Sequence, residues 1–442
     1  MTAHPWYGST PYRRPPATST ARIRNLVRDH LRDTGALSSE LVPVAPFTVP
    51  DDSYGELTRS ARLLLDLVRR TVLALAPDVP GRLAALGMDP GHHPMFLDDE
   101  ALEEEFAACN VRADVVIGEA GPQLLEFNTS GAAGGIVEAH LWHRAWREIF
   151  ERQGAFPLRG GDPLDARAQM FQDVCLQHGL PPRVGLVGSL RDLPRAATSR
   201  YFDVQLRHLH RHGFAADFFE PEQLSGVTGD RLPFAVGLRQ FTTAEWREAG
   251  IDAEPVRAAM KAGCLLLPTQ SARLLNNKKV LALVSEGQPW MSAAERRAVA
   301  RYLPWTRLVE DRQVWWQGRE VPLLDLAERD RDGFVLKEAV GMKGLQVLLG
   351  RDTDAAAWRA ALERAVRERD SIIQRYVEPG RTRLEISLSD TETEVRPVAP
   401  ILSPILVAGR PAGVWARFFV DGSAGVVSRD GFGALENVVL AG

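Results

Sequence analysis

The chain has 442 residues, of which 45% are hydrophobic and 25% are charged, as in an ordinary soluble globular protein. Its net charge of -4 gives no general reason to expect a nucleic acid or a membrane as a partner. The sequence contains no membrane-spanning run and no secretory signal, and its three isolated cysteines are typical of a reducing compartment. We therefore expect a cytoplasmic protein of two or three domains.

The first segments along the chain read as an arm followed by helices. Residues 1–54 are expected to form an N-terminal arm, which is polar and Pro-rich at its start. Leucines recur at helical spacing within 55–86, which predicts a helix there. A short acidic helix is expected over 98–108.

A β-hairpin is predicted over residues 112–131, which read RADVVIGEAGPQLLEFNTSG. Successive strand residues face opposite sides, so the apolar residues of each strand define one face. These residues are Val115, Ile117, Leu125 and Phe127. They share a face if the loop holds an odd number of residues, and residues 120–122 would form such a loop.

The same register gathers three polar side chains on the other face of the hairpin. It places Asp114 opposite Asn128 and diagonal to Glu126. Carboxylate and amide oxygens suit Mg²⁺, which usually keeps waters and shares substrate phosphates. An amphipathic hairpin with solvated polar residues would show the same pattern, so both interpretations stand at this point.

A second unit begins near residue 182 and alternates short apolar strands with helices. This alternation predicts a parallel sheet covered by helices. The segment GLVGSL lacks the G-x-G-x-x-G spacing, which disfavours a dinucleotide-dependent oxidoreductase. His208, His210 and His212 recur at every second residue, an interval that does not share a helix face. We therefore expect a solvated helix end there rather than a zinc site.

The third unit carries candidate phosphate-binding residues. In FVLKEAVGMKGLQVLLG, Lys337 ends an apolar strand, and Gly341 and Gly344 shape a loop whose backbone can approach phosphate oxygens. The loop is not a Walker loop, and a plain hairpin with a surface lysine would give the same pattern. NNKK places Lys278 or Lys279 at a helix start, where the helix dipole does not favour a cation. A lysine in that position indicates a bound anion.

These motifs together resemble the ATP-grasp ligases. Residues 271–380 resemble the nucleotide-binding half of that family, through NNKKVLALVSE, LPWTRLV, FVLKEAVGMKGLQVLLG, a helix with Trp358, and SIIQRYVEPG. The hairpin resembles the family's metal-binding segment, an Arg-x-Asp strand followed by a Glu-x-Asn strand. The hairpin precedes the lysines, an order that resembles the circularly permuted branch with its glutathionylspermidine synthase-like proteins. The resemblance covers most of residues 95–442.

The resemblance implies a set of nucleotide-binding residues. They are Lys278, Lys337, Gly341, Lys343, Gly344, Gln374, Tyr376, Val377 and Glu378. The two lysines would hold the ATP phosphates, with Lys279 as a competitor for the first position, and the 341–345 loop would close over the triphosphate. Gln374 departs from the acid of many relatives, which puts its contact with adenine in doubt. The ribose would contact Glu378 or Glu385.

The resemblance also implies a metal site and two arginine roles. Asp114, Glu126 and Asn128 would bind Mg²⁺. Arg112 would lie beside the phosphates. Arg417, in GVWARFF, matches an arginine of permuted relatives that would neutralise the transferred phosphoryl group, although a surface strand residue would fit its position equally well.

The expected fold is α/β (α+β), an ATP-grasp core in circularly permuted order with a parallel-sheet substrate domain. The expected divisions are an arm (1–54), a helical and metal-binding part (55–165), an α/β substrate domain (166–270), an ATP-binding lobe (271–380) and a C-terminal part of the core (381–442).

The resemblance implies an ATP-dependent ligase that joins a carboxylate to an amine through an acyl phosphate and releases ADP and phosphate. Its partners would be small-molecule or peptide acids and amines. Two alternatives remain open from the sequence: acyl transfer to a carrier-protein thiol by the same chemistry, and a nucleotide-binding protein without catalytic activity.

Overall fold

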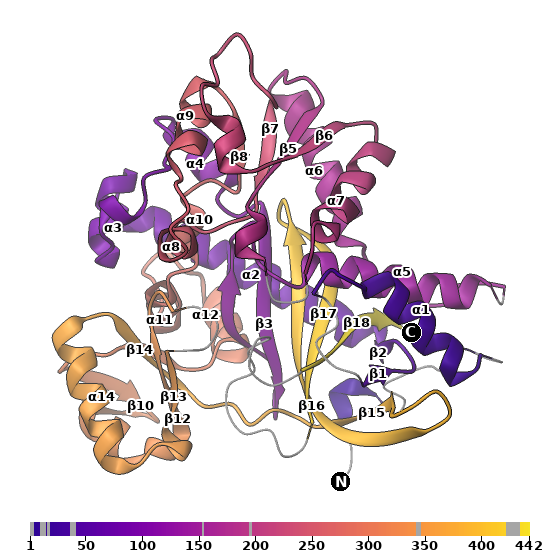
Figure 1. Ribbon diagram of the computed structural model, residues 1–442. Coiled ribbons are helices and arrows are strands. Elements are labelled where there is room, and N and C mark those ends of the chain that lie inside the picture. Colours follow the sequence, from indigo (N-terminus) through magenta and orange to yellow (C-terminus); the bar gives the residue numbers. More distant parts are fainter. Residues whose placement is uncertain are drawn as a thin grey trace.

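Figure 1 shows the protein as a computed structural model, in which helices cover several β-sheets. The structure describes residues 4–8, 15, 18–35, 41–152, 154–193, 197–341, 346–420 and 434–442. The expected mixed α/β fold with a parallel-sheet unit is confirmed. None of the helices within these residues combines the length and the apolar composition needed to cross a membrane.

The main sheet draws strands from three separate stretches of the chain. Its order is β1-β15-β16-β17-β18-β2, and the hairpin β3–β4 is attached to β16. All neighbours pair antiparallel except β18 and β2, which run parallel. The bounds are β1 (Val42–Pro43), β2 (Phe47–Val49), β3 (Asn110–Gly118), β4 (Gly121–Asn128), β15 (Thr382–Ser387), β16 (Thr393–Val407), β17 (Arg410–Val420) and β18 (Leu435–Ala441).

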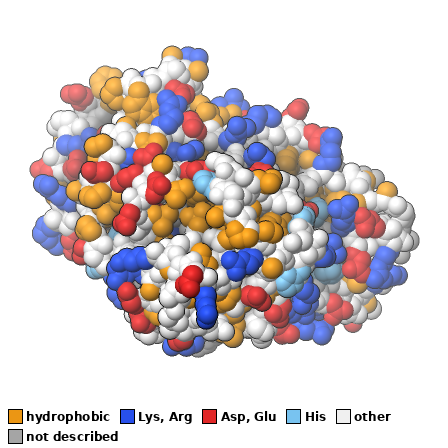
Figure 2. Space-filling view, turned by 90° about the horizontal axis from the view of Figure 1, so that it is seen from above, with side chains coloured by type: hydrophobic (Ala, Val, Ile, Leu, Met, Phe, Trp, Pro, Cys, Tyr) orange, Lys and Arg blue, Asp and Glu red, His pale blue; other side chains and the backbone are white. Residues whose placement is uncertain are grey.

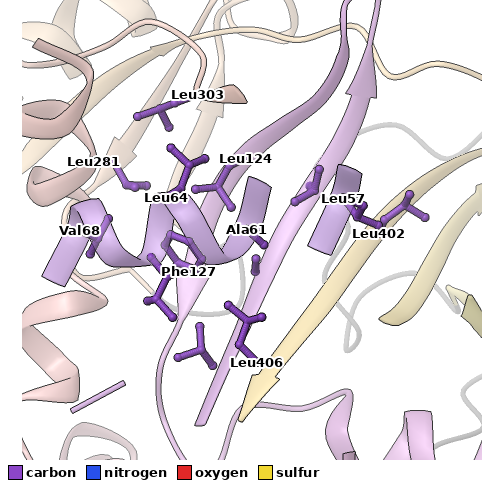
Figure 3. Packing of buried hydrophobic residues seen from close by; sticks show 14 of the residues in the cluster. Leu57, Ala61, Leu64, Val68, Leu124, Phe127, Leu281, Leu303, Leu402 and Leu406 are labelled. Atoms are coloured by element: carbon purple, nitrogen blue, oxygen red, sulfur yellow. The ribbon is translucent and has the colours of Figure 1, made fainter. Parts of the chain in front are cut away.

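Helices cover both faces of the main sheet because alternate strand residues point to opposite sides. In Figure 3, Leu64 of α2 is drawn near Leu124 of the hairpin and Leu57 of α2 near Leu402 of β16, and all four belong to one core cluster. Ile405 and Trp415 belong to a second core cluster, shared with α5. The helices around this sheet are α1 (Thr20–Leu31), α2 (Asp51–Leu75), α3 (Val79–Leu86), α4 (Glu100–Phe106), α5 (Ile136–Glu151) and α6 (Pro163–Gln177). The expected arm therefore contains a helix and two sheet strands.

The hairpin forms where it is predicted, but its loop is shorter. Gly118 pairs with Gly121, so the loop holds only Glu119 and Ala120. The expected three-residue loop over 120–122 is therefore wrong. A two-residue connection is the commonest hairpin loop, and Gly121 has a φ of +108° directly after it.

A β-bulge in the second strand contributes one extra residue, which has the same effect on strand alternation as a loop with an odd number of residues. Val115 pairs with Leu124 and Asp114 pairs with Glu126, which leaves Leu125 without a partner in the ladder. Leu124, rather than the expected Leu125, is therefore buried in the core.

The bulge also sets the polar face of the hairpin. Asp114 lies opposite Glu126, and Arg112 lies opposite Asn128. The expected pairing of Asp114 with Asn128 is thus wrong by two residues. The polar side chains nevertheless share a face, because the bulge changes the alternation of β4 as an odd loop would have done.

A second sheet is parallel throughout and follows the order β6-β5-β7-β8. We call this sheet and its helices the α/β layer; it lies at the top of Figure 1. Its strands are β5 (Arg183–Val187), β6 (Ala215–Phe219), β7 (Val236–Arg239) and β8 (Leu265–Leu267), and its helices include α7 (Arg200–Arg211), α8 (Thr243–Glu248) and α9 (Glu254–Ala262).

A third sheet is antiparallel, with the order β13-β12-β14-β9, and lies at the lower left of Figure 1. Its strands are β9 (Thr306–Leu308), β12 (Phe334–Glu338), β13 (Val347–Leu349) and β14 (Ser371–Arg375). The neighbouring elements are α10 (Ala272–Leu275), α11 (Lys278–Glu286), α12 (Ala293–Tyr302), the hairpin β10 (Gln313–Trp316) and β11 (Arg319–Pro322), α13 (Leu323–Arg329) and α14 (Ala355–Glu368). The side chain of Asp354 caps α14 by accepting hydrogen bonds from the backbone amides of Ala356 and Ala357.

Candidate active site

A cavity of about 640 Å³ is lined by the main sheet, the α/β layer and the antiparallel sheet. Its volume is that of a typical small-molecule site. The predicted site residues that line it are Arg112, Asp114, Glu126, Asn128, Lys278, Lys337, Gly341, Gln374, Tyr376, Val377 and Arg417. Lys343 and Gly344 lie outside the described residues. The structure therefore brings most of the predicted residues to one place.

Asp114 is the centre of a buried ionic network. Arg112 binds it with two hydrogen bonds of 3.1 Å, and an Nη atom of Arg417 lies 2.9 Å from its Oδ1. Ser403 and Asn128 donate further hydrogen bonds at 2.9 and 3.3 Å. Ser403 was not indicated by any sequence motif; it reaches the network because β16 pairs with the hairpin. The network fixes both arginines at the cavity wall.

Glu126 faces the two lysines. The Nζ atom of Lys278 lies 3.4 Å from its Oε2 and also donates to the carbonyl of Gly341 at 3.3 Å. Lys279 points elsewhere, because its Nζ donates to the carbonyl of Leu86. Of the two candidate lysines, the structure therefore places only Lys278 in the cavity.

Lys337 is held from two sides. Its Nζ donates to Oε1 of Gln374 at 2.8 Å and to the carbonyl of the bulge residue Leu125 at 3.4 Å. Gln374 is buried, and its amide nitrogen donates to Thr306 at 3.1 Å. Both ends of the Gln374 amide are thus engaged within the protein, which fits a role in positioning Lys337.

The charges around the two carboxyl groups keep both of them ionised. Burial alone raises the pKa of Asp114, but Arg112 and Arg417 outweigh it and hold that pKa well below its usual range. Burial also raises the pKa of Glu126, but the positive charges of Lys278 and Lys337 outweigh this effect. The pKa of Glu126 is therefore lowered. Burial lowers the pKa of Lys337 to about 8.

The carboxylates fit a hard divalent cation. Asp114 and Glu126 are direct cross-strand neighbours on one face, so their charges repel unless a cation or cationic side chain lies near them. Both are ionised, as metal coordination requires, and Asn128 adds an amide oxygen within the same cavity. These three residues could hold Mg²⁺, as their chemistry predicts.

The far end of the antiparallel sheet gives the cavity an apolar and aromatic wall. Tyr376 and Val377 follow β14 and line the cavity, and the guanidinium carbon of Arg351 lies 3.9 Å from the Tyr376 ring centroid. Glu378 forms an ion pair with Arg351 at 2.9 Å and is largely exposed. Neither Glu378 nor Glu385 lines the cavity within the described part of the chain.

The opposite end of the cavity was not indicated by any sequence motif. It is lined by Ser189, Arg191, Tyr201, Gln240, Thr242, Glu245, Arg273 and Asn276. Ser189 and Gln240 follow the carboxyl ends of β5 and β7, which are the edge where parallel α/β sheets bind ligands. That rule, applied to the predicted strands, could have found them.

Trp415 supports the two arginines of the network. The guanidinium carbons of Arg112 and Arg417 lie 5.6 and 5.0 Å from its ring centroid. Gly135 begins α5 with a φ of +95°, and a Cβ there would lie 2.4 Å from the Trp415 ring. Arg112 also donates to the carbonyl of Gly134 at 2.7 Å. The Gly-rich turn therefore contacts both Trp415 and Arg112.

Comparison with known proteins identifies the fold. No protein-family model and no curated protein matches the chain. The structure is similar to that of a glutathione synthetase-like effector from Globodera pallida, with a TM-score of 0.59 and 11% sequence identity over 95% of this chain and 96% of that one. A candidate gamma-glutamylcysteine synthetase from Methylobacillus flagellatus KT matches with a TM-score of 0.40 and 13% identity over 84% of this chain and 83% of that one. The chain thus shares the overall fold of this glutathione synthetase-like effector.

Proposed function

We propose that the protein is an ATP-dependent ligase that joins a carboxylate to an amine and releases ADP and phosphate. One observation carries the proposal. Glu126 of the hairpin lies 3.4 Å from Lys278, in the same cavity as Lys337 and Arg417, although these residues come from distant parts of the chain. The similarity in fold to a glutathione synthetase-like protein supports the same reaction class.

The charges of the cavity suit a nucleoside triphosphate with Mg²⁺. Arg112, Lys278, Lys337 and Arg417 place more positive charge around the centre of the cavity than Asp114 and Glu126 balance. A triphosphate would take up this excess, and a Mg²⁺ ion on the two carboxylates would share its oxygens. The base would then lie toward Tyr376 and Val377, at the aromatic end.

The reaction needs no protein nucleophile. A carboxylate oxygen of the acid attacks the terminal phosphorus of ATP, ADP leaves, and an acyl phosphate forms. The amine nitrogen then attacks the acyl carbon and loses a proton as phosphate leaves. Arg417 and the two lysines would stabilise the charge on the transferred phosphoryl group, and the walls of the cavity would limit the access of water to the acyl phosphate.

The acid and amine would bind at the α/β-layer end of the cavity. Arg273 is buried there, and a buried guanidinium is well suited to bind a carboxylate. Gln240 and Thr242 add neutral hydrogen-bonding groups beside it. This lining supports an amino acid or a peptide as the acid substrate.

We also infer that the core is circularly permuted. The hairpin that carries Asp114 and Glu126 precedes Lys278 and Lys337 along the chain and yet lies against them in the cavity. This order supports a relation to the permuted branch with its glutathionylspermidine synthase-like proteins.

Two measurements on the whole chain test the proposed function. Calorimetry with a non-hydrolysable ATP analogue and Mg²⁺ should show one binding site per chain. Lys278→Gln should lower the affinity for the analogue, whereas Lys279→Gln should leave that affinity unchanged. A panel of paired acids and amines, read by ADP release and mass spectrometry, should then give a condensed product that requires both partners.

The outcomes separate the proposed reaction from its rivals. Glu126→Gln should lower turnover by about 100-fold or more without loss of fold. If product forms only with a carrier-protein thiol, the acyl group of the acyl phosphate is transferred to that thiol and not to an amine, by the same ATP-dependent chemistry. Nucleotide binding with no turnover across the panel would support a non-catalytic protein, and absence of nucleotide binding would reject the proposal altogether.

A further inference from the structure

A cluster of histidine and aspartate side chains lies on α6 and α7, outside the cavity described above. His208 lies in the last turn of α7 and His212, four residues later, caps the carboxyl end of that helix, so the two imidazoles lie on one side of it. His210 points away, and its Nε2 lies 2.7 Å from the carbonyl of Ala216. The expected solvated helix end is therefore wrong for His208, which is buried, whereas His210 and His212 are exposed.

Asp165, in the first turn of α6, lies against both imidazoles. Its Oδ1 is 3.0 Å from Nε2 of His208 and 3.3 Å from Nε2 of His212. The candidate ligand atoms of the three residues all lie within 4.8 Å of one another. In a tetrahedral zinc site, bonds of roughly 2.0–2.1 Å put neighbouring ligand atoms roughly 3.3 Å apart. The two measured distances thus match those of ligands around one small cation.

The buried state of His208 is a second, independent observation. The residue is 5% exposed, and neither ring nitrogen forms an aligned hydrogen bond with any described residue, despite the short distance to Asp165. Buried imidazole nitrogens normally have a partner. A cation between the Asp165 oxygen and the His208 Nε2 would supply one.

The surroundings also favour a cation. The histidines lie at the carboxyl end of α7, where the helix dipole is negative, and Asp165 lies in the first turn of α6, where the dipole favours its ionised form. His140 stacks edge-on against His208 with centroids 5.0 Å apart, and it is itself held by Asp162 at 2.7 Å. Figure 2 looks down on the α/β layer and shows histidine side chains reaching the surface of this face; Asp165 and His212 are exposed.

We propose that Asp165, His208 and His212 form a binding site for a divalent cation of the zinc class. Two imidazole nitrogens and one carboxylate oxygen are a borderline-soft ligand set that suits Zn²⁺ or Co²⁺ and disfavours Mg²⁺. The exposed side of the cluster leaves a fourth position for water. None of the three residues lines the cavity, so the site is separate from the proposed nucleotide site. Its metal would clamp α6 to α7.

The experiment uses the full chain and two probes, Zn²⁺ and Co²⁺. Titration of metal-free protein with Co²⁺ at pH 7.5 should give the visible absorption of a tetrahedral site with one ion per chain, and Zn²⁺ should displace it. Zn²⁺ should also raise the midpoint of thermal unfolding. Asp165→Asn and His212→Gln should each weaken Zn²⁺ binding by roughly 10–100-fold or more.

Two control variants show whether Co²⁺ binds at this site or at another histidine or carboxylate of the chain. His210→Gln changes the same residue type on the same helix and should leave Co²⁺ binding unchanged. Glu126→Gln, which should lower turnover by about 100-fold or more, should also leave the tetrahedral Co²⁺ spectrum unchanged, so failure of the proposed ligase function would not affect the result. The proposal is overturned if the wild-type chain gives no tetrahedral Co²⁺ spectrum, or if His210→Gln weakens binding as much as His212→Gln.

Discussion

Lys337 on β12 donates a 2.8 Å hydrogen bond to Gln374 on the neighbouring strand β14. The acceptor is a neutral amide, so it orients the ammonium group without adding an opposite charge. Burial therefore dominates and lowers the pKa of Lys337 to about 8, despite the nearby Glu126. This pair makes the charge of the cavity sensitive to pH in an accessible range.

We expect nucleotide affinity to fall as the pH rises through about 8. The protonated form of Lys337 attracts phosphate, and deprotonation of the free protein removes that attraction. Calorimetry with a non-hydrolysable ATP analogue between about pH 7 and 9.5 measures the effect. Gln374→Glu should move the inflection upward by about 1 pH unit or more, because an acid beside Lys337 favours its charged form. An inflection that stays in place in this variant would contradict the assignment.

Replacement of Asp114 by asparagine should destabilise the protein by about 3 kcal/mol at pH 7, because Arg112 and Arg417 lose their buried counter-charge. The folded-state pKa of Asp114 is depressed, so its stabilisation is present above roughly pH 4 and is lost as the pH falls through the lower folded-state pKa. Denaturant unfolding at pH 7 and in acid should show the difference shrinking in acid. Asp66→Asn, at an exposed ion pair, serves as the control and should change stability by less than about 0.5 kcal/mol.

Alanine at Gly135 should impair the site through Trp415. The added Cβ would lie 2.4 Å from that ring, which supports both arginines, so we expect turnover to fall by about 100-fold. Gly179 also has a positive φ, of +62°, but nothing within 4 Å of an added Cβ. Gly179→Ala should therefore cost about 1 kcal/mol of stability and leave activity unchanged. Equal loss of activity in both variants would show that backbone strain alone is responsible.

The contact between α2 and the main sheet should dominate the stability of the core. Leu64 is 1% exposed within the cluster of Figure 3, so Leu64→Ala should cost about 2–5 kcal/mol. Leu73 lies on the same helix and is 37% exposed, so Leu73→Ala should change stability by less than about 1 kcal/mol. Denaturant unfolding followed by tryptophan fluorescence compares the two.

Local patterns were sufficient to predict most elements of the fold. The parallel strands of the α/β layer, the helix with Trp358 and the apolar strand that contains Lys337 all form as their sequence patterns indicate. The hairpin register was not predictable, because a bulge and an odd loop both place Phe127 on the apolar face with Val115, and the adjacent Leu124 and Leu125 are equally apolar. The choice between them depends on packing against α2 and β16.

The site was predictable where residues follow a motif and not where they meet through tertiary contacts. The hairpin residues and the two lysines were found, whereas Ser403 and Arg273 lie in the network and the cavity without any motif of their own. The bond between Gln374 and Lys337 likewise depends on strand pairing. Roles that the resemblance assigned to these residues remain predictions until the variants above are measured.

The unpaired Leu125 sets a limit on how the hairpin can change. On its loop side the strand presents Leu124 to the core, and on its other side it presents Phe127 to the core and Glu126 to the cavity. Deletion of Leu125 would restore strict alternation along the strand. Leu124 and Phe127 could then no longer both face the core while Glu126 faces the cavity, so one part of the strand would have to expose its side chains on the opposite face. The hairpin should therefore tolerate substitutions at Leu125 far more readily than any change in the number of residues between Leu124 and Glu126.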